Sequence, residues 1–312
     1  MKNSDTYSIS LMCDVLNVSR ASFYHYFYYS NDDSFERKIF IIRRILEIYY
    51  DSKRIYGAPR ITAVLRKEGL SISVKTVSKY MSLLGIQSIV KTNFPKKKNT
   101  MSELEKSKII NLIKNLDIIR PNQVWVTDIT YIKTRDDGFV YLSSIIDLFS
   151  RKVIAWNVGH NMKKELVIET LNNAFKNRNY PINVIIHSDK GTQYRSHAFR
   201  SLIIKNNCLF SYTSLNHSCD ENANQESFHA SLKKEWLYNQ FFNTINDVRR
   251  EVFRYIEVFY NHKRIHSSLG FVSPSTFEFQ FFNKIPLLPL SNLLTQLPGI
   301  KKIHKLFILT II

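Results

Sequence analysis

Residues 6–90 carry apolar positions at the three-to-four-residue spacing of amphipathic helices. The segment 34–53 shows this spacing most clearly, with one apolar face made of Ile39, Ile42, Ile45, Leu46 and Tyr49. Shorter helices are predicted over 8–17, around Ile61 to Leu65, and over 73–81, and Gly69 and Gly85 are typical stop signals for the last two. The first part of the chain is therefore predicted to be all helical.

Beyond residue 122 the pattern changes to the two-residue alternation of strands. The segment 124–132 shows this alternation, and Asp136-Asp137-Gly138 after it is typical of a hairpin turn. Further strands are predicted at 139–146, 152–158, 184–186 and 210–213, and helices at 163–178, 196–206, 224–238 and 245–260. Strands interleaved with helices predict a mixed α/β domain built in layers.

The strongly basic net charge of the chain indicates what kind of partner it binds. The 312-residue chain has a formal net charge of +18 and an isoelectric point near 9.7. Such an excess of Lys and Arg is typical of proteins that bind nucleic acid. Two short helices joined by a tight turn, the second bearing Lys75 and Lys79, fit a helix-turn-helix, and 8–29 fits a further one. The alternative is a small helical domain with a solvated basic face.

Other classes of protein are disfavoured. No signal peptide is predicted, because the N-terminus has no long apolar stretch. No membrane-spanning segment is predicted either, because the apolar stretch 304–312 is too short to cross a bilayer. Cys13, Cys208 and Cys219 are too widely spaced to signal a disulfide framework or a zinc site. These features indicate a cytoplasmic protein without a membrane partner.

Three segments far apart in the sequence each present one carboxylate in a setting suited to a metal ion. Asp128 lies within the predicted strand 124–132, where burial is costly unless the carboxylate is paired or binds a metal. Asp189 follows the buried strand 184–186, at the strand end where α/β folds gather ligands. Glu226 lies on a predicted helix. Taken alone, each carboxylate is equally well explained as a buried or capping residue.

Glu226 shares one face of its predicted helix with His229 and Lys233. Hard cations such as Mg²⁺ prefer carboxylate oxygens. Two such ions activate an attacking oxygen and stabilise a leaving oxygen in phosphodiester chemistry. In a basic chain, three such carboxylates favour a metal-dependent enzyme of nucleic acids.

These residues stand within longer motifs: YGAPR at 56–60, NQVWVTDITY at 122–131, IDLFSR at 146–151, HSDKGTQY at 187–194, ESFHASLKKE at 226–235 and YNHKRIHSSLG at 260–270. In this order and at these distances, the motifs resemble those of the second-frame (OrfB-type) insertion-sequence transposases, which have a retroviral-integrase-like catalytic core. The resemblance covers residues 8 to about 278.

The resemblance implies an α/β fold with a ribonuclease H-like mixed sheet flanked by helices, after an N-terminal all-α helix-turn-helix region. It implies that Asp128, Asp189 and Glu226 are the catalytic residues and hold Mg²⁺ or Mn²⁺, as two ions. It also implies a basic residue seven positions after the glutamate, and Lys233 fits that position. The residues expected to contact DNA are Lys233, Arg60, Lys75, Lys79 and Arg264.

Five segments are predicted along the chain. They are a helix-turn-helix-like segment at 1–33, a helical DNA-binding domain at 34–91, a linker at 92–120, an integrase-type catalytic core at 121–279, and a tail of unclear role at 280–312. The linker is polar and basic around 92–100, and three prolines interrupt the Leu- and Ile-rich tail.

One departure from the family pattern concerns the third carboxylate. One residue more than usual lies between Asp189 and Glu226, and Glu221 is the alternative third member of the triad. Glu226 is preferred because the motif that follows it has the expected spacing. The insertion is either a harmless loop change or the mark of a decaying element.

We therefore expect a transposase that cleaves DNA strands and joins them to a target by transesterification. The alternatives are a DNA-binding remnant without catalysis and a nuclease of the same fold that only hydrolyses. The expected partners are the element ends and target DNA, further copies of the chain, and an upstream-frame helix-turn-helix product. The expected location is the bacterial cytoplasm, on the nucleoid.

Overall fold

The computed structural model describes residues 7–29, 33–90, 111–114, 116–213 and 223–284. They divide into two compact units. The first holds the described residues up to Val90 together with Lys233–Asn239, and the second holds the rest. The five predicted segment boundaries stay predictions.

The first unit is helical, as the apolar spacing predicted. Its helices are α1 (Ile9–Val15), α2 (Arg20–Tyr29), α3 (Asp33–Asp51), α4 (Ala58–Lys67) and α5 (Val74–Leu83). Apolar side chains from α3, α4 and α5 are fully buried, among them Ile45, Ile61, Leu65 and Val77. Gly69 and Gly85 follow α4 and α5 with φ of 89° and 64°, the left-handed conformation that glycine adopts at helix ends.

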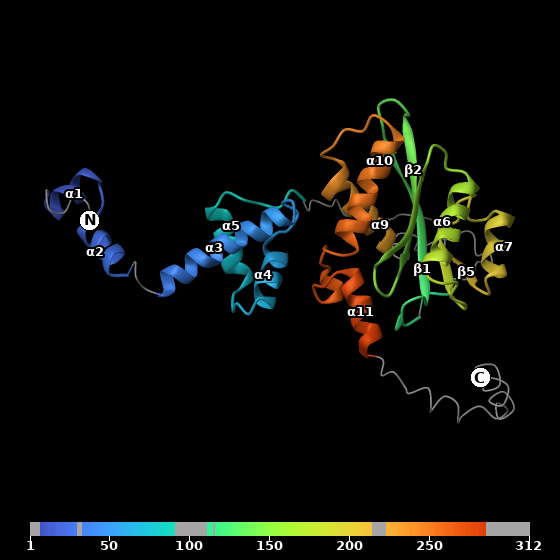
Figure 1. Ribbon diagram of the computed structural model, residues 1–312, viewed down its shortest axis with the longest axis horizontal. Helices are drawn as coiled ribbons and strands as arrows, with labels where there is room; N and C mark the ends of the chain where they lie inside the picture. The colour runs from blue at the N-terminus through green and yellow to red at the C-terminus, as the bar shows by residue number, and fades with distance from the viewer. Residues whose placement is uncertain (1–6, 30–32, 91–110, 115, 214–222, 285–312) are drawn as a thin grey trace, which may run out of the picture. The chain divides into compact units, whose positions relative to one another are not determined.

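A five-stranded sheet forms the centre of the second unit (Figure 1). Its strands are β1 (Val124–Lys133), β2 (Phe139–Asp147), β3 (Val153–Gly159), β4 (Ile185–Ser188) and β5 (Leu209–Tyr212). The strand order is β3-β2-β1-β4-β5. The first three strands pair antiparallel, β4 pairs parallel with β1, and β5 pairs parallel with β4. This mixed sheet confirms the predicted ribonuclease H-like fold class.

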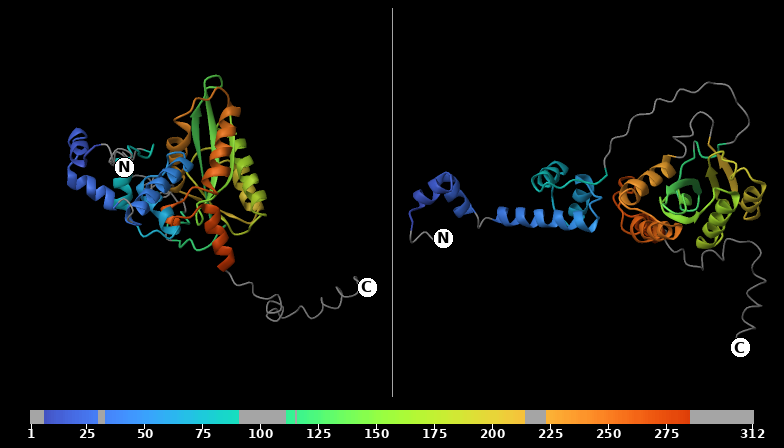
Figure 2. Two further views of the ribbon diagram at one scale, coloured as in Figure 1. Left: turned by 60° about the vertical axis from the view of Figure 1, so that its left-hand side comes forward. Right: turned by 90° about the horizontal axis from the view of Figure 1, so that it is seen from above.

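Helices cover both faces of the sheet (Figures 1 and 2). One face carries α6 (Lys164–Asn177) and α7 (His197–Lys205), and the other carries α9 (Ala223–Leu232) and α10 (Ile245–Phe253). Trp125 of β1 packs with Leu171 and Phe175 of α6 in the main apolar core. Because side chains alternate along a strand, Asp128 points to the opposite face, toward α9.

Two of the predicted helices change from α-helical to π-helical hydrogen bonding before they end. The helix expected over 224–238 is α9 followed by a π-helical segment, η1 (Lys233–Leu237). The helix expected over 245–260 is α10 followed by a second π-helical segment, η2 (Arg254–Tyr260). Apolar periodicity alone does not separate these hydrogen-bonding patterns, and π-helical turns are often found at functional sites.

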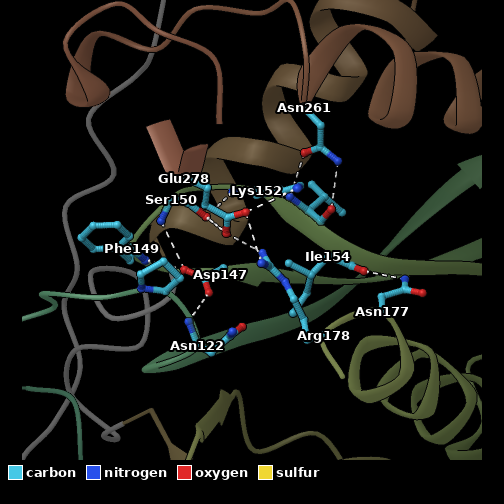
Figure 3. A network of polar contacts seen from close by, with 12 residues as sticks. Asn122, Asp147, Phe149, Ser150, Lys152, Ile154, Asn177, Arg178, Asn261 and Glu278 are labelled. Carbon is cyan, nitrogen blue, oxygen red and sulfur yellow. Dashed lines mark hydrogen bonds and ion pairs between the residues drawn. The ribbon is translucent and has the colours of Figure 1, made fainter. Parts of the chain in front are cut away.

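The core continues past the predicted motifs into α11 (Pro274–Lys284), which follows a short 3₁₀ turn, η3 (Ser267–Leu269). Figure 3 shows how Glu278 of α11 is held. Its carboxylate accepts hydrogen bonds from Arg178, Ser150 and Lys152. Next to this group, the fully buried Asp147 accepts backbone N–H bonds from Asn122, Phe149 and Ser150. The network ties α11 to the ends of β2 and α6. Most of the tail predicted at 280–312 lies outside the described residues.

Candidate active site

Two of the predicted carboxylates lie on neighbouring parallel strands, Asp128 in the middle of β1 and Asp189 directly after β4. Val126 of β1 and His187 of β4 are register partners. Asp128 and Asp189 each lie two positions further along, so the two residues lie beside each other at one level of the sheet. The strand geometry therefore brings together two residues that are far apart in the sequence.

The electrostatics of Asp189 reflect this proximity. Burial raises the pKa of Asp189, the backbone N–H of Gly191 at 2.9 Å from Oδ1 opposes the rise, and the negative charge of Asp128 adds to it. Two carboxylates that repel each other are a suitable donor set for a hard cation, because the cation offsets the repulsion.

Asp128 is contacted through both of its carboxylate oxygens. Oδ1 accepts the backbone N–H of Ile129 at 2.8 Å, and Oδ2 lies 3.5 Å from Nδ1 of His229 on α9. The other ring nitrogen of His229 lies 3.0 Å from Oγ of Ser144. Ser144 is the register partner of Asp128 on β2, so both side chains stand on the same face of the sheet.

Gln225 completes this buried polar cluster. Its Nε2 donates to the backbone carbonyl of Ser144 at 3.0 Å and also to Ser144 Oγ. Sequence reasoning placed His229 near the carboxylates but gave no role to Ser144 or Gln225. The available signal was a pair of serines in the middle of an otherwise apolar strand, since buried polar groups need partners.

Tyr194, in the segment that follows β4, and His187 of β4 anchor the backbone on both sides of Asp189. Tyr194 is fully buried, its hydroxyl lies 3.3 Å from Thr127 Oγ1, and its carbonyl accepts a hydrogen bond from Tyr212. Burial and the charge of Asp128 raise the pKa of Tyr194 well above its ordinary value. Buried His187 bonds to Ser211 of β5 through Nδ1 at 2.9 Å. These contacts fix the backbone that leads into and out of Asp189.

Glu226 lies in the first turn of α9 and its side chain is exposed. The buried residues of α9 are Gln225, Phe228, His229 and Leu232, so Glu226 is exposed whereas His229, which was predicted to share its helix face, is buried. Among the residues that the structure describes, no three His, Cys, Asp or Glu side chains lie close enough to hold a metal ion. The alternative, Glu221, lies outside the described residues.

The lysines expected to contact DNA differ in their settings. Lys75 and Lys79 are exposed on α5 of the first unit. Lys233 is half-buried and begins η1, directly after α9.

The two arginines also differ. Arg60 is in the first turn of α4, with its guanidinium 5.5 Å from the ring of Tyr56. Arg264 is only 5% exposed. Its Nη1 lies 2.9 Å from Nε2 of His266, and its Nη2 donates to Ser231 of α9 at 3.3 Å. Arg264 thus connects the segment after η2 to α9.

The sheet, its helices and the paired aspartates place the second unit among integrase-type cores. Two families described as integrase core domains match residues 119–218 and 210–274, and a family described as an HTH-like domain matches residues 36–94. The predicted core and helix-turn-helix region are confirmed by these matches.

Whole-chain relatives are transposases. The transposase InsF for insertion sequence IS3A of Escherichia coli (strain K12) is 35% identical over 281 residues, which cover 89% of this chain and 96% of the relative. The transposase for insertion sequence element IS904 of Lactococcus lactis subsp. lactis (strain IL1403) is 35% identical, covering 78% of this chain and 94% of the relative. The chain belongs to the IS3 family of insertion-sequence transposases, and it is an enzyme of DNA transposition.

Solved structures with some similarity include the simian T-cell lymphotropic virus intasome in complex with PP2A regulatory subunit B56 gamma. The similarity has a TM-score of 0.45 at 16% identity and covers 78% of this chain and 76% of that chain. Another is the HTLV-2 integrase catalytic core domain in complex with magnesium, with a TM-score of 0.40 at 14% identity and coverage of 51% and 98%. Within the described part of this chain, no helix is long and apolar enough to cross a membrane.

Proposed function

We propose that the chain cleaves DNA at the ends of an insertion sequence and joins the freed 3′-hydroxyl ends to target DNA, with Asp128, Asp189 and Glu226 as its catalytic residues. The observation that carries the proposal is the proximity of Asp128, in the middle of β1, to Asp189, directly after β4, close enough for the charge of Asp128 to raise the pKa of Asp189. Neighbouring carboxylates on rigid strands are a suitable support for a site that must hold its geometry.

Asp128 and Asp189 fit a divalent ion, because both offer carboxylate oxygens and their repulsion is offset by a cation. Two ions, Mg²⁺ or Mn²⁺, would supply activation of the attacking oxygen and stabilisation of the leaving oxygen. Glu226, at the start of α9, would complete the set of oxygen donors.

The chemistry is two displacements at phosphorus. In the first, water attacks the phosphodiester at the element's end, and the bond to the 3′-oxygen breaks. In the second, the resulting 3′-hydroxyl attacks a target phosphodiester, a new phosphorus–oxygen bond forms, and the target strand's own 3′-oxygen leaves. No covalent bond to the protein is required in either step.

DNA binding is assigned to both units. Lys75 and Lys79 on the exposed side of α5, with Arg60 at the start of α4, would contact backbone phosphates in a helix-turn-helix arrangement. Lys233, seven positions after Glu226 and directly after α9, would contact a phosphate of the DNA backbone. Arg264 is largely buried, and its contribution to DNA binding would come from holding its segment against α9.

Transposition must bring two DNA ends together, so we propose that the active form is a homo-oligomer. An upstream-frame helix-turn-helix product is a further proposed partner. Because the substrate is DNA, we place the protein on the nucleoid in the bacterial cytoplasm.

The test is a strand-transfer assay with a labelled element end and a target plasmid, in Mg²⁺ or Mn²⁺ and with chelator as the control. Wild-type protein should form joined products, whereas Asp128→Asn, Asp189→Asn and Glu226→Gln should bind DNA without joining it. Hydrolysis without joining would indicate the nuclease alternative. Full strand transfer by Asp128→Asn would disprove the proposed site, and DNA binding with neither hydrolysis nor joining in any condition would favour the remnant.

A further inference from the structure

We infer that His229 is a positioning residue for Asp128, held in one tautomer by Ser144 and Gln225 so that its Nδ1–H faces the carboxylate. The inference rests on the proposed function, because it concerns how Asp128 is presented to a cation. It assigns roles to three residues that do not carry out the chemistry themselves.

The first step is the orientation of Gln225. Its amide lies 3.0 Å from the backbone carbonyl of Ser144, and a carbonyl oxygen only accepts hydrogen bonds. The amide nitrogen must therefore point at Ser144, since the opposite orientation would place two acceptors together. The same nitrogen then donates to Ser144 Oγ as well.

The second step is the proton of the Ser144 hydroxyl. Ser144 is fully buried, and within the described part of the chain its Oγ has two hydrogen-bond partners, Gln225 and His229. Because Gln225 is a donor, the hydroxyl proton can be given only to Nε2 of His229, at 3.0 Å. Nε2 is then an acceptor without a proton of its own.

The third step is the tautomer. A neutral imidazole whose Nε2 accepts carries its proton on Nδ1, because the partner of one ring nitrogen determines the state of the other. Nδ1 lies 3.5 Å from Oδ2 of Asp128. This distance is long for a hydrogen bond, and the contact acts mainly by directing a positive N–H dipole at one oxygen.

The consequence concerns the orientation of Asp128. Oδ1 is held by the Ile129 N–H and Oδ2 is faced by His229, so rotation of the carboxylate is restricted from both sides. Groups that orient metal-binding carboxylates typically change metal affinity or activity by about 10–100-fold when they are removed. The register of β1 and β2 places Ser144 opposite Asp128, so the sheet holds Ser144, and through it His229, in position.

The decisive measurement uses the full-length wild-type chain, metal-free and labelled with ¹⁵N in its histidines. Long-range ¹H–¹⁵N spectra at neutral pH, with His229→Asn to identify the signals, report which ring nitrogen is protonated. We expect a protonated Nδ1 and an unprotonated Nε2 for His229. A proton on Nε2, or on both nitrogens, would overturn the inference. This result does not depend on catalysis, so it stands apart from failure of the strand-transfer test.

Paired variants separate positioning from folding. His229→Asn keeps an amide donor near the Nδ1 position, whereas His229→Gln moves the amide toward Ser144 and leaves Asp128 without a donor. Calorimetric titration with Mn²⁺ should give an affinity within about threefold of wild type for His229→Asn and about 10–100-fold weaker for His229→Gln. Equal affinities in the two variants would contradict the inference. Thermal unfolding and far-UV circular dichroism check that both variants fold. If either variant does not fold, the ¹H–¹⁵N spectra of the wild-type chain alone test the inference.

Discussion

Nη2 of Arg178, at the end of α6, lies 2.6 Å from Oε1 of Glu278 on α11, and both side chains are largely buried. Nη1 of the same guanidinium reaches Oε2 at 3.1 Å, so the pair is bidentate. Ser150 and Lys152 add hydrogen bonds to the same carboxylate (Figure 3). A single carboxylate thus joins the last described helix to the catalytic sheet.

Replacing Glu278 with Gln should lower the free energy of unfolding by about 3 kcal/mol, because Arg178 would keep a buried charge without its counterion. Urea unfolding followed by tryptophan fluorescence measures the loss. Arg254→Ala is the matched control, since it breaks an equally short pair with Glu251 but removes an exposed arginine and leaves Glu251 with Arg250 as a second partner, so it should cost at most about 1 kcal/mol. Similar losses in both variants would contradict the role given to Glu278.

The same carboxylate should make stability depend on pH. Burial alone would raise the pKa of Glu278, but the hydrogen bond and charge of Arg178 outweigh it and lower the pKa. A lowered folded-state pKa means that the stabilisation is complete above the ordinary carboxyl value and is lost as the pH falls through the folded value.

The quantity to follow is the difference in unfolding free energy between wild type and Glu278→Gln. It should be constant near neutral pH and shrink below about pH 4.5, the region of ordinary glutamate titration. The difference is needed because burial raises the pKa of Asp147, which therefore contributes with the opposite sign in both proteins. A difference that grows on acidification would refute the assignment.

Gly191→Ala should impair catalysis without unfolding the protein. A Cβ at this position would collide with the Gln193 side chain and lie 3.0 Å from Oδ1 of Asp189, the oxygen that the Gly191 N–H now holds. Displacement of the carboxylate by a fraction of an ångström to 1 Å should slow strand transfer by up to about 100-fold. Thr192→Ala, an exposed change in the same turn, is the control and should retain the wild-type rate. Equal rates in both variants would mean that the Asp189 position is not critical.

Lys75→Ala and Lys79→Ala should each weaken DNA binding in a salt-dependent way. Loss of one phosphate contact should reduce the slope of log K against log salt by about 0.9. Fluorescence anisotropy with a labelled element end over a range of salt concentrations measures the slope. Lys176→Ala, an exposed lysine on α6, should leave it unchanged. An unchanged slope in the α5 variants would remove this helix from the interface.

Local patterns were enough to predict the strands, and the resemblance of the motifs implied that Asp128 and Asp189 belong to one site. Alternation located β1, and a short apolar run ending before Asp189 located β4. The parallel pairing of β1 with β4 then brings Asp128, in the middle of β1, beside Asp189, which directly follows β4.

Other features depend on contacts between distant residues. Which side of α9 is buried is decided by hydrogen bonds of Gln225 and His229 to Ser144 of β2 and by the contact of Phe228 with rings of η2, not by helical periodicity alone. Likewise α11 has little apolar periodicity of its own, and it is anchored by Glu278 to groups at least a hundred positions earlier. Such pairings have no local signature in a single sequence.

The shared register of β1 and β4 determines where this chain tolerates changes of length. A residue inserted into either strand ahead of its aspartate would turn that carboxylate to the opposite face of the sheet, because side chains alternate. A residue inserted between the elements only lengthens a connection, at a small entropic cost. Length variation during the divergence of such chains should therefore collect in the connections and be absent from these two strands.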